Sequence, residues 1–336
     1  MEKGKKKLLI ALCCVGGFFL ALAIFLLVWF FGARYPQFDK LAREEFAIPG
    51  LSDGACPQGL CALPENAGGY DFAMSAYFDE GASKIWLIDG QDESRNLSFY
   101  VLDGKKRDDA HFGGVTCSDE YLYVASGSRV GCLALSDVFA VQDGGEIPAE
   151  YFDAGLGVAF LQYAQNHLYV GEFYRPGNYE TDASHHLQTA DGQTNPALVF
   201  VYAAGEGVGG IDSSAPKAAL SVREQVQGIA VFDGGIALSC SYGLPDSGIW
   251  VYENVFEGEQ QGSFSQDGKE IPLYMLDETC RIGTLTAPCM SEEIEVKDGR
   301  LYILFESKAN KYKMFTRVRE SHVRSVALED LLALEK

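Results

Sequence analysis

One histidine, one amide and three carboxyl side chains could do chemistry in this sequence, because each lies near the start or the end of a strand-like stretch. They are His111, Gln227, Glu292, Glu172 and Glu306. A histidine beside carboxylates can serve as a general acid or base, or as a cation ligand. Carboxylates suit a hard cation such as Ca²⁺, whose coordination carbonyl oxygens and water would complete. A divalent cation held by these residues is therefore one interpretation of the pattern.

Each of these residues also has a structural interpretation. His111 can be a hydrogen-bonded residue at the start of a strand, and Glu172 and Glu306 can be edge charges that discourage unwanted strand pairing. Glu292 and Glu293 are neighbours, and successive side chains of a strand point to opposite faces, so at most one is expected in a channel. No motif fixes a reaction, so no catalytic residue is assigned.

The candidates lie beside three similar hairpin patterns. GGVTCSDEYLYVA at 113–125, QGIAVFDGGIAL at 227–238 and EEIEVKDGRLYIL at 292–304 each place polar turn residues between two apolar strands. Repetition of one such unit indicates a repeat protein. His111, Gln227 and Glu292 then stand at comparable places, at the entrance to the first strand of a hairpin.

Strand patterns dominate from residue 69 to the end and fall into five groups. The groups begin near residues 72, 113, 158, 228 and 293, and this spacing overlaps the period of propeller blades when insertions are allowed. A sixth group could lie in 35–69 or in 253–289. A lone antiparallel group cannot bury both faces, whereas groups arranged around an axis can. The sequence therefore predicts an all-β fold, a β-propeller of about five blades, with a flat β-sandwich as the alternative.

An uncharged apolar run at 8–31 precedes the strand region, and about 20 such residues span a bilayer core. The run is longer than the apolar part of a cleavable signal peptide, so we expect a retained signal anchor. The lysines at positions 3, 5, 6 and 7 should stay in the cytoplasm. The expected organisation is a basic tail at 1–7, a transmembrane helix at 8–32, a stalk leading into the propeller at 33–68, and an ectodomain at 69–336 outside a single-pass cell-membrane anchor.

The net charge of −20 makes nucleic acid an unsuitable partner, because a phosphate backbone would be repelled. An acidic surface tolerates cationic partners or Ca²⁺, and it also serves plain solubility.

Seven cysteines lie beyond the apolar run, and an oxidising compartment makes disulfides possible. Cys56 and Cys61 are close together in a Pro/Gly-containing segment and are expected to pair. Cys280 and Cys289 could clip the connection between two repeats. Cys117 and Cys132 are expected on strands separated by a third strand, which is beyond disulfide reach. The sequence contains no Cys-x-x-Cys pair of the kind that indicates a zinc site.

A polar insertion at 175–196 interrupts the third group. It contains His185 and His186 beside Glu180 and Asp182, which could bind a transition metal or simply form an exposed polar loop. The similar stretches LALSDVF at 133–139 and VALEDLL at 326–332 predict in each case a strand that runs into a short helical turn.

The hairpins QGIAVFDGGIAL and EEIEVKDGRLYILFES resemble inner blade strands of extracytoplasmic bacterial propellers, loosely those of the strictosidine synthase/gluconolactonase-like and esterase-like phytase groups. The resemblance extends over about 72–336 as architecture. It implies that the start of each inner strand faces a central channel, where acidic and amide side chains often hold a metal or substrate. The equivalent positions in this chain are Gly113, Gln227 and Glu292.

Two functions are compatible with these observations. The first is a membrane-anchored binding or interaction module at a bacterial cell envelope, with the blade-top loops and the insertion 175–196 recognising an extracellular protein or glycan. The second is a hydrolase or lactonase with a divalent cation in the propeller channel. The two differ in what they require of the candidate side chains. Convergence of three or more of them in a central pocket favours the enzyme, whereas wide separation favours the binding module.

Overall fold

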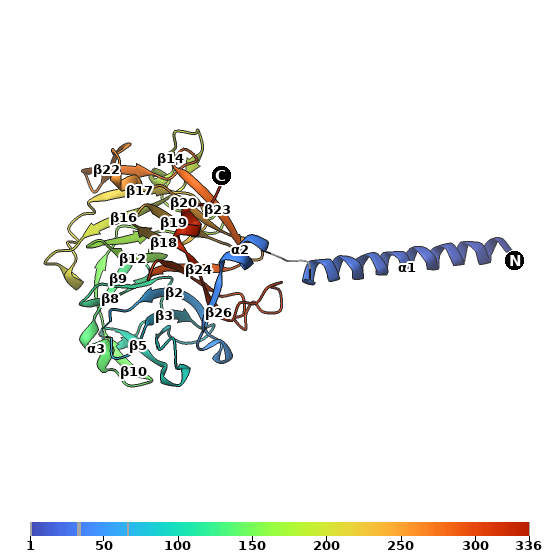
Figure 1. The fold of residues 1–336 in the computed structure, drawn as a ribbon, viewed down its shortest axis with the longest axis horizontal. Helices are drawn as coiled ribbons and strands as arrows, with labels where there is room; N and C mark the ends of the chain where they lie inside the picture. The colour runs from blue at the N-terminus through green and yellow to red at the C-terminus, as the bar shows by residue number, and fades with distance from the viewer. Residues whose placement is uncertain (1, 32–34, 66, 336) are drawn as a thin grey trace.

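A computed structural model describes residues 2–31, 35–65 and 67–335 of the chain, and within α1 it describes the side chains of residues 4, 6, 7 and 12–28 only. The predicted boundary between anchor and stalk, at residues 32 and 33, lies outside the described part. Helix α1 (Glu2–Phe31) covers the apolar run and stands apart from a β domain (Figure 1). Within the described residues, no helix has both the length and the apolar character needed to cross a membrane.

In the described residues, the β domain contains five sheets of four to six strands, which we number as blades by the order of their innermost strands, and one small two-stranded sheet. Blade 1 contains β2 (Cys56–Ala62), β3 (Phe72–Tyr77), β4 (Lys84–Ile88) and β5 (Leu97–Asp103), with β6 (Lys106–Arg107) and β10 (Gly145–Pro148) at its edge. Blade 2 contains β7 (Val115–Cys117), β8 (Tyr121–Ser126), β9 (Arg129–Ala134) and β11 (Glu150–Asp153).

Blade 3 is the widest sheet. It contains β12 (Phe160–Ala164), β13 (His167–Gly171), β16 (Ala197–Ala203), β17 (Ala218–Val222), β22 (Lys269–Met275) and β21 (Gly262–Gln266). Blade 4 contains β18 (Val226–Phe232), β19 (Gly235–Cys240), β20 (Ser247–Tyr252) and β23 (Arg281–Ala287). Blade 5 contains β24 (Ser291–Lys297), β25 (Arg300–Phe305), β26 (His322–Ala327) and the N-terminal strand β1 (Arg43–Ala47). A small hairpin of β14 (Leu187–Gln188) and β15 (Thr194–Asn195) lies in the insertion.

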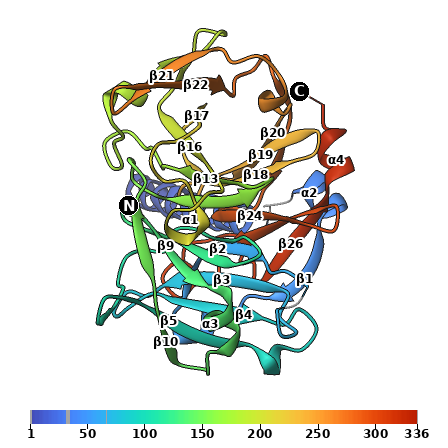
Figure 2. The ribbon, with the colours of Figure 1, turned by 90° about the vertical axis from the view of Figure 1, so that its left-hand side faces the viewer.

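The innermost strands form a closed ring, because β2 contacts β7, β7 contacts β12, β12 contacts β18, β18 contacts β24, and β24 contacts β2. Figure 2 shows β2, β18 and β24 meeting near the centre of the molecule. This arrangement confirms the predicted five-bladed β-propeller. The segments considered for a sixth blade supply β1, β2, β21, β22 and β23 to the five blades instead.

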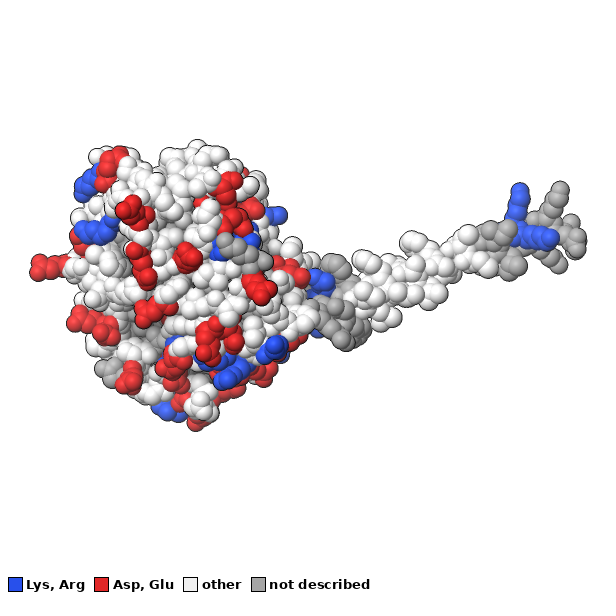
Figure 3. Space-filling view, turned by 45° about the horizontal axis from the view of Figure 1, so that its top comes forward, with Lys and Arg blue, Asp and Glu red and all other residues white. Residues whose placement is uncertain are grey.

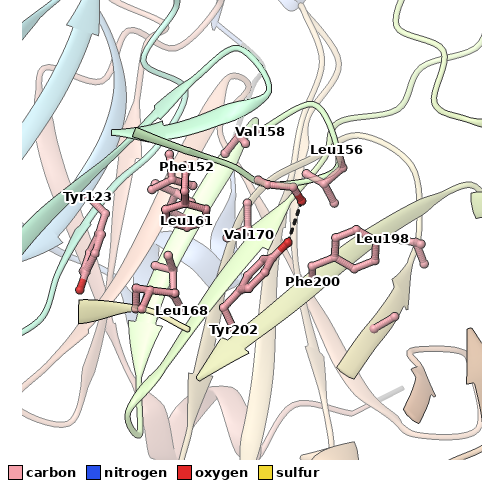
Figure 4. Close-up of a cluster of buried hydrophobic side chains, with 14 of the residues drawn as sticks. Tyr123, Phe152, Leu156, Val158, Leu161, Leu168, Val170, Leu198, Phe200 and Tyr202 are labelled. Carbon is pink, nitrogen blue, oxygen red and sulfur yellow. Dashed lines mark hydrogen bonds between the residues drawn. The ribbon is translucent and has the colours of Figure 1, made fainter. Parts of the chain in front are cut away.

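Each blade buries both faces, and this explains why the strands are almost continuously apolar. In β16, Leu198, Phe200 and Tyr202 pack against blade 2, whereas the alternate residues Val199 and Val201 pack against blade 4. Period-two alternation therefore sends every other side chain into a different interblade core. Figure 4 shows the cluster between blades 2 and 3, including the hydrogen bond that the Tyr202 hydroxyl donates to the Ala154 carbonyl at 2.9 Å. A flat sandwich, which buries one face of each sheet, is excluded.

The N-terminal strand closes the ring. β1 pairs antiparallel with β26, so the last blade combines both ends of the domain. Helix α2 (Pro36–Leu41) precedes it and buries Phe38 against the Phe305 ring, with ring centroids 6.2 Å apart. Residues 43–62, expected in the stalk, therefore belong to blades 5 and 1. The reason is that β2 carries Pro57 and Gly59 and a β-bulge, features that are typical of a loop when only the sequence is known.

Strand β22 pairs with β17, so residues 269–275 extend blade 3, and residues 312–318 form turns and bends. The two predicted helical turns are present as α3 (Leu135–Ala140) after β9 and α4 (Leu328–Leu332) after β26.

The expected disulfides are wrong. Cys56 and Cys61 begin and nearly end strand β2, roughly 15 Å apart in extended chain, and Cys280 and Cys289 flank strand β23 at a still larger separation. A disulfide requires Cα atoms within about 7 Å. All seven cysteines of the propeller are free thiols. Cys117 and Cys132 lie on β7 and β9 with β8 between them, as predicted.

The surface of the propeller is acidic, in line with the composition. Figure 3 shows red acidic side chains scattered over the visible face, with blue basic side chains between them and at the far end of α1. The acidic groups are dispersed on that face, and no basic surface suited to a phosphate backbone is visible there.

Candidate functional site

A pocket of about 400 Å³ opens at the end of the propeller axis where the inner strands begin. Four of the five candidate side chains line it, namely His111, Gln227, Glu292 and Glu306. Blade 1 adds Gln58 and Tyr77, and the loops of blades 3, 4 and 5 add Phe173, Tyr179, Ser241, Tyr242 and Tyr312. The predicted convergence at the strand entrances is therefore present in the structure, although no role for these residues follows from position alone.

Three β-bulges explain how inner strands present polar side chains to the pocket. The register shifts between Pro57 and Leu60 in β2, between Val226 and Gly228 in β18, and between Ser291 and Ile294 in β24. A bulge places an extra residue opposite one partner and turns its side chain away from the regular alternation. The residues in these three bulges include Gln58, Gln227 and Glu292.

A chain of polar contacts crosses the pocket and joins four blades. His111 Nε2 lies 3.1 Å from Gln58 Oε1, and Gln58 Nε2 donates to Glu306 Oε2 at 3.2 Å. The carboxyl groups of Glu306 and Glu292 are within hydrogen-bonding reach of each other. Gln227 Nε2 then donates to Glu292 Oε1 at 3.4 Å. Because the Gln58 amide nitrogen already donates to Glu306, its oxygen is the acceptor, and His111 must carry the proton on Nε2.

The two carboxyl groups are deeply buried, and their ionisation reflects this. Burial, followed by the charge of Glu306, raises the pKa of Glu292 well above its usual range. Burial likewise raises the pKa of Glu306 to about 7. Two carboxylates in contact cannot both ionise easily, so the pair holds at least one proton near neutral pH. Burial and the nearby Lys311 ammonium lower the pKa of His111 to about 4, so this histidine is neutral near pH 7. The residue still keeps part of its surface exposed to solvent.

Glu293 lies beneath the pocket and is completely buried. Its Oε2 accepts hydrogen bonds from the backbone N–H groups of Leu60 and Val115, and its Oε1 accepts one from Leu161 N–H, all at 2.9 Å. The donors belong to the inner strands of blades 1, 2 and 3. Glu292 thus lines the pocket while Glu293 reaches the strands around the axis. The expectation that at most one of them lines the channel is therefore confirmed, since Glu292 borders the pocket and Glu293 does not.

Glycines allow the strands to approach this carboxylate closely. A Cβ atom on Gly114 would lie 2.7 Å from Leu161 N and 2.8 Å from Glu293 Oε1, and one on Gly228 would lie 2.7 Å from Glu293 Cα. These separations are shorter than van der Waals contact, so a larger residue would force the backbone apart. The Gly-Gly and Gln-Gly sequences at the hairpin entrances are explained by this crowding at the axis.

Aromatic rings flank the pocket on two sides. Phe173 and Tyr179 follow β13, and Tyr242 follows β19; their ring centroids lie 5.4 to 6.3 Å apart, and we call these three residues the aromatic wall. On the side of blades 1 and 5, the hydroxyl groups of Tyr77 and Tyr312 are 2.9 Å apart. The Tyr77 ring also lies 3.7 Å from the His111 ring, centroid to centroid.

Glu172 does not join the other candidates. Its Oε1 accepts hydrogen bonds from Leu198 N–H at 2.9 Å and from the neighbouring His185, whose Nδ1 is 2.7 Å away. Both side chains are buried below blade 3, where His185 attaches the insertion to the sheet. His186 points elsewhere, toward the Thr181 hydroxyl at 3.0 Å. Glu172 and Glu306 therefore do not converge on one site. His185 and His186 also point in different directions.

No group of three or more His, Cys, Asp or Glu side chains in the described parts of the chain is arranged to hold a metal ion. In the pocket, Glu292 and Glu306 face each other, and His111 is directed at the Gln58 amide. A metal ion placed there would therefore find two carboxyl groups but no third strong ligand in the described lining.

Sequence reasoning missed Gln58 and the aromatic residues. Gln58 lies in CPQGLC, where the proline and glycine indicated a loop, and its place at a strand entrance was the available signal. Phe173, Tyr179 and Tyr242 lie in loops whose positions depend on packing between distant blades. The tyrosines of such loops carry no local pattern that distinguishes a pocket wall from a surface.

Comparison with solved structures gives similarity in fold alone. Glutaminyl cyclase of Myxococcus xanthus matches with a TM-score of 0.44 and 10% identity, over 85% of this chain and 94% of that chain. A glucose dehydrogenase-like putative oxidoreductase of Thermus thermophilus matches with a TM-score of 0.39 and 12% identity, over 85% and 98%. A chain of a nidogen/laminin complex gives a TM-score of 0.37 and 8% identity, over 75% and 73%. No family model and no curated protein matches the sequence.

Proposed function

We propose that this protein is a binding module whose ligand is a small organic molecule held in the axial pocket. The observation that carries the proposal is the chain of contacts from His111 through Gln58, Glu306 and Glu292 to Gln227. It brings donors and acceptors from four blades, of which Gln58, Glu292 and Glu306 are buried, to one opening between two groups of aromatic rings. Ligand pockets typically combine apolar and aromatic walls with a few convergent polar groups.

The structural alternatives explain these residues less well. A purely structural carboxyl group is typically paired with a cation or hydrogen-bonded by backbone donors, as Glu293 is by three N–H groups. Glu306 instead accepts a hydrogen bond from a glutamine side chain and borders open space. Burying two adjoining carboxyl groups in this way costs folding free energy, which a binding role accounts for.

We extend the proposal to location. An N-terminal anchor at a bacterial cell membrane is supported by the exposed side chains of α1, where Leu12, Phe18 and Phe19 are 61 to 65% exposed, and by the lysines at its start. Extraction of membranes with alkaline carbonate tests this part. Recovery of the full-length chain in the soluble fraction would refute it. An extracellular protein or glycan could then reach the loops and the insertion around the pocket.

The binding role is tested by a ligand screen on full-length protein in a neutral maltoside detergent. We expect members of a panel of sugars, amines, amino acids and short peptides to raise the melting temperature of the wild type. Gln227→Trp should abolish this shift because the larger ring fills the pocket, whereas Gln142→Trp, at an exposed site, should retain it. Shifts that persist in Gln227→Trp, or a panel without any shift, would refute the pocket as a binding site.

A second function is supported by the carboxyl pair. One protonated and one ionisable carboxyl group in contact can act together as general acid and general base on a bound water molecule. Direct contact is closer than the roughly 5 Å or more between the two carboxyl groups of glycosidases, so hydrolysis of esters, lactones or amides fits better. Loss of hydrolysis in both Glu292→Gln and Glu306→Gln, with retained melting temperature, is the expected result for an enzyme. Hydrolysis at the wild-type rate in both variants would exclude an enzymatic role of the carboxyl pair.

A further inference from the structure

The pocket contains buried acid without a matching cation. Glu292 and Glu306 are 2% and 9% exposed, and among the described residues lining the pocket there is no lysine or arginine. His111 is neutral, because burial lowers the pKa of its ring. The Lys311 ammonium lies outside the lining, although its charge acts to lower the pKa of Glu306. It is bound to the Tyr77 hydroxyl at 3.3 Å and to Asp79 at 3.1 Å, and it lies 5.0 and 5.6 Å from the centroids of the Tyr77 and Tyr312 rings. Within the described lining, a cation in direct contact with the carboxyl pair would therefore come from the ligand.

The walls of the pocket are suited to an organic cation. The aromatic wall of Phe173, Tyr179 and Tyr242 stands on the side of blades 3 and 4, and Tyr77 and Tyr312 stand on the side of blades 5 and 1. Aromatic faces carry partial negative charge and attract ammonium groups, most strongly where water is excluded. Tyr77 and Tyr312 already lie beside the Lys311 ammonium. The three rings of the aromatic wall are therefore the ones that can add attraction for a ligand cation near the carboxyl pair.

The protein itself shows that one of these rings accepts a cation. The Arg175 guanidinium lies 3.7 Å from the centroid of the Tyr242 ring. Arg175 is not part of the pocket lining, whereas Tyr242 is. The Asn178 side chain donates to the Tyr242 hydroxyl at 2.9 Å and fixes this ring against the insertion. The ring is thus held in place where it borders the pocket.

From these observations we infer that the ligand of the axial pocket is an organic ammonium compound, whose cationic head lies between the aromatic rings and above Glu292 and Glu306. This inference rests on the proposed binding function and specifies its ligand class. A head group with methyl substituents suits the rings, because it combines positive charge with an apolar surface. A metal ion is a poorer match, since Ca²⁺ takes six to eight oxygen ligands and the described lining offers one carboxyl pair.

A matched pair of probes isolates the charge. Choline and 3,3-dimethyl-1-butanol have the same shape, but the first carries a quaternary nitrogen where the second carries carbon. We expect isothermal titration of the full-length protein, in a maltoside detergent that lacks a choline group, to detect choline, and the neutral compound to bind about 30-fold more weakly. Tetramethylammonium should compete with choline, and CaCl₂ at equal ionic strength should not.

Variants locate the site. Tyr179→Leu should weaken choline binding about tenfold without affecting folding, because this ring is 52% exposed. Glu306→Gln should weaken it by a similar factor through loss of charge. Phe315→Leu and Glu206→Gln are the controls, since both residues are exposed and neither lines the pocket. The controls should bind choline as the wild type does.

The possible outcomes separate this inference from the proposed function. Equal binding of choline and its neutral analogue, lost in Tyr179→Leu, would overturn the ammonium ligand and leave a binding pocket. Binding of Ca²⁺ that displaces choline and is lost in Glu306→Gln would overturn it in favour of an inorganic cation. No binding of any ammonium probe at 10 mM (roughly the millimolar range of weak ligands) would overturn it as well. Failure of the broader ligand panel in addition would refute the binding function.

Discussion

Replacement of Glu293 is the sharpest test of how the propeller is held together at its axis. Its carboxylate accepts three backbone N–H groups from blades 1, 2 and 3, each at 2.9 Å. A buried donor left without a partner costs about 1 to 3 kcal/mol. Glu293→Ala removes the acceptor from all three, so the free energy of unfolding should fall by about 3 to 9 kcal/mol. A domain of this kind is stable by about 5 to 15 kcal/mol, so this loss removes a large part of its stability.

Glu293→Gln is the graded form of the same change. The side-chain amide keeps one oxygen, which can still accept from Leu60 and Val115, but it turns an NH₂ group toward Leu161 N–H. One buried donor is then unsatisfied and faces another donor. The expected loss is about 1 to 3 kcal/mol, which leaves a folded protein whose stability can be measured.

Urea unfolding followed by circular dichroism and by tryptophan fluorescence gives both values. The matched control is Glu292→Gln at the adjacent residue, which has a protonated carboxyl contact and a glutamine partner but no backbone donor. Glu292→Gln should lower the free energy of unfolding by less than about 1 kcal/mol. The reasoning is refuted if Glu293→Ala unfolds within about 1 kcal/mol of the wild type, or if the two glutamine variants lose equal stability.

Three further predictions address ionisation, crowding and closure. Burial raises the pKa of Glu306 from 4.5 to about 7, so the folded protein holds a proton that the unfolded chain releases. Stability should therefore be highest below pH 4.5 for this group and fall by on the order of 3 kcal/mol as the pH rises to 7; Glu306→Gln should flatten this part of the pH profile of urea unfolding. Gly228→Ala should destabilise by about 1 to 3 kcal/mol, because its Cβ would meet the β24 backbone at 2.7 Å, whereas Gly157→Ala, with no atom within 4 Å of a Cβ, should not. Phe46→Ala should cost about 3 kcal/mol in thermal unfolding, since β1 packs this ring 4.7 Å from that of Phe72; an unchanged midpoint would show that β1 does not hold the last blade.

The fold was predictable because its signals are local. Turn residues between apolar strands mark each hairpin, and the recurrence of hairpins at 113–125, 227–238 and 292–304 specifies stacked sheets. The same repeats place Gln227 and Glu292 at the entrances of inner strands and His111 two residues before such an entrance. The entrances of the inner strands meet around one axis, so the convergence of these residues follows from the architecture.

The parts that could not be predicted depend on departures from regular structure or on distant contacts. The β-bulges hid Gln58 in an apparent loop and allowed both Glu292 and Glu293 to reach the interior. Glu172 and Glu306 follow similar strand sequences, but His185 from the insertion binds the first, and a glutamine from blade 1 binds the second. The sequence of a hairpin does not show which residue from another blade or loop will contact it.

The order of synthesis gives the axial contacts a consequence for assembly. Glu293 follows Leu60 by 233 positions, and Glu306 follows Gln58 by 248, so the acceptors for the earliest blades are translated near the end. Until blade 5 emerges, the N–H groups of Leu60, Val115 and Leu161 have no carboxylate, and β1 has no β26 to pair with. Contacts so distant in sequence are slow to form. A chain truncated before blade 5 would leave these backbone N–H groups without an acceptor and the pocket without Glu292 and Glu306. Addition of the last strands therefore closes the ring and completes the pocket at the same time.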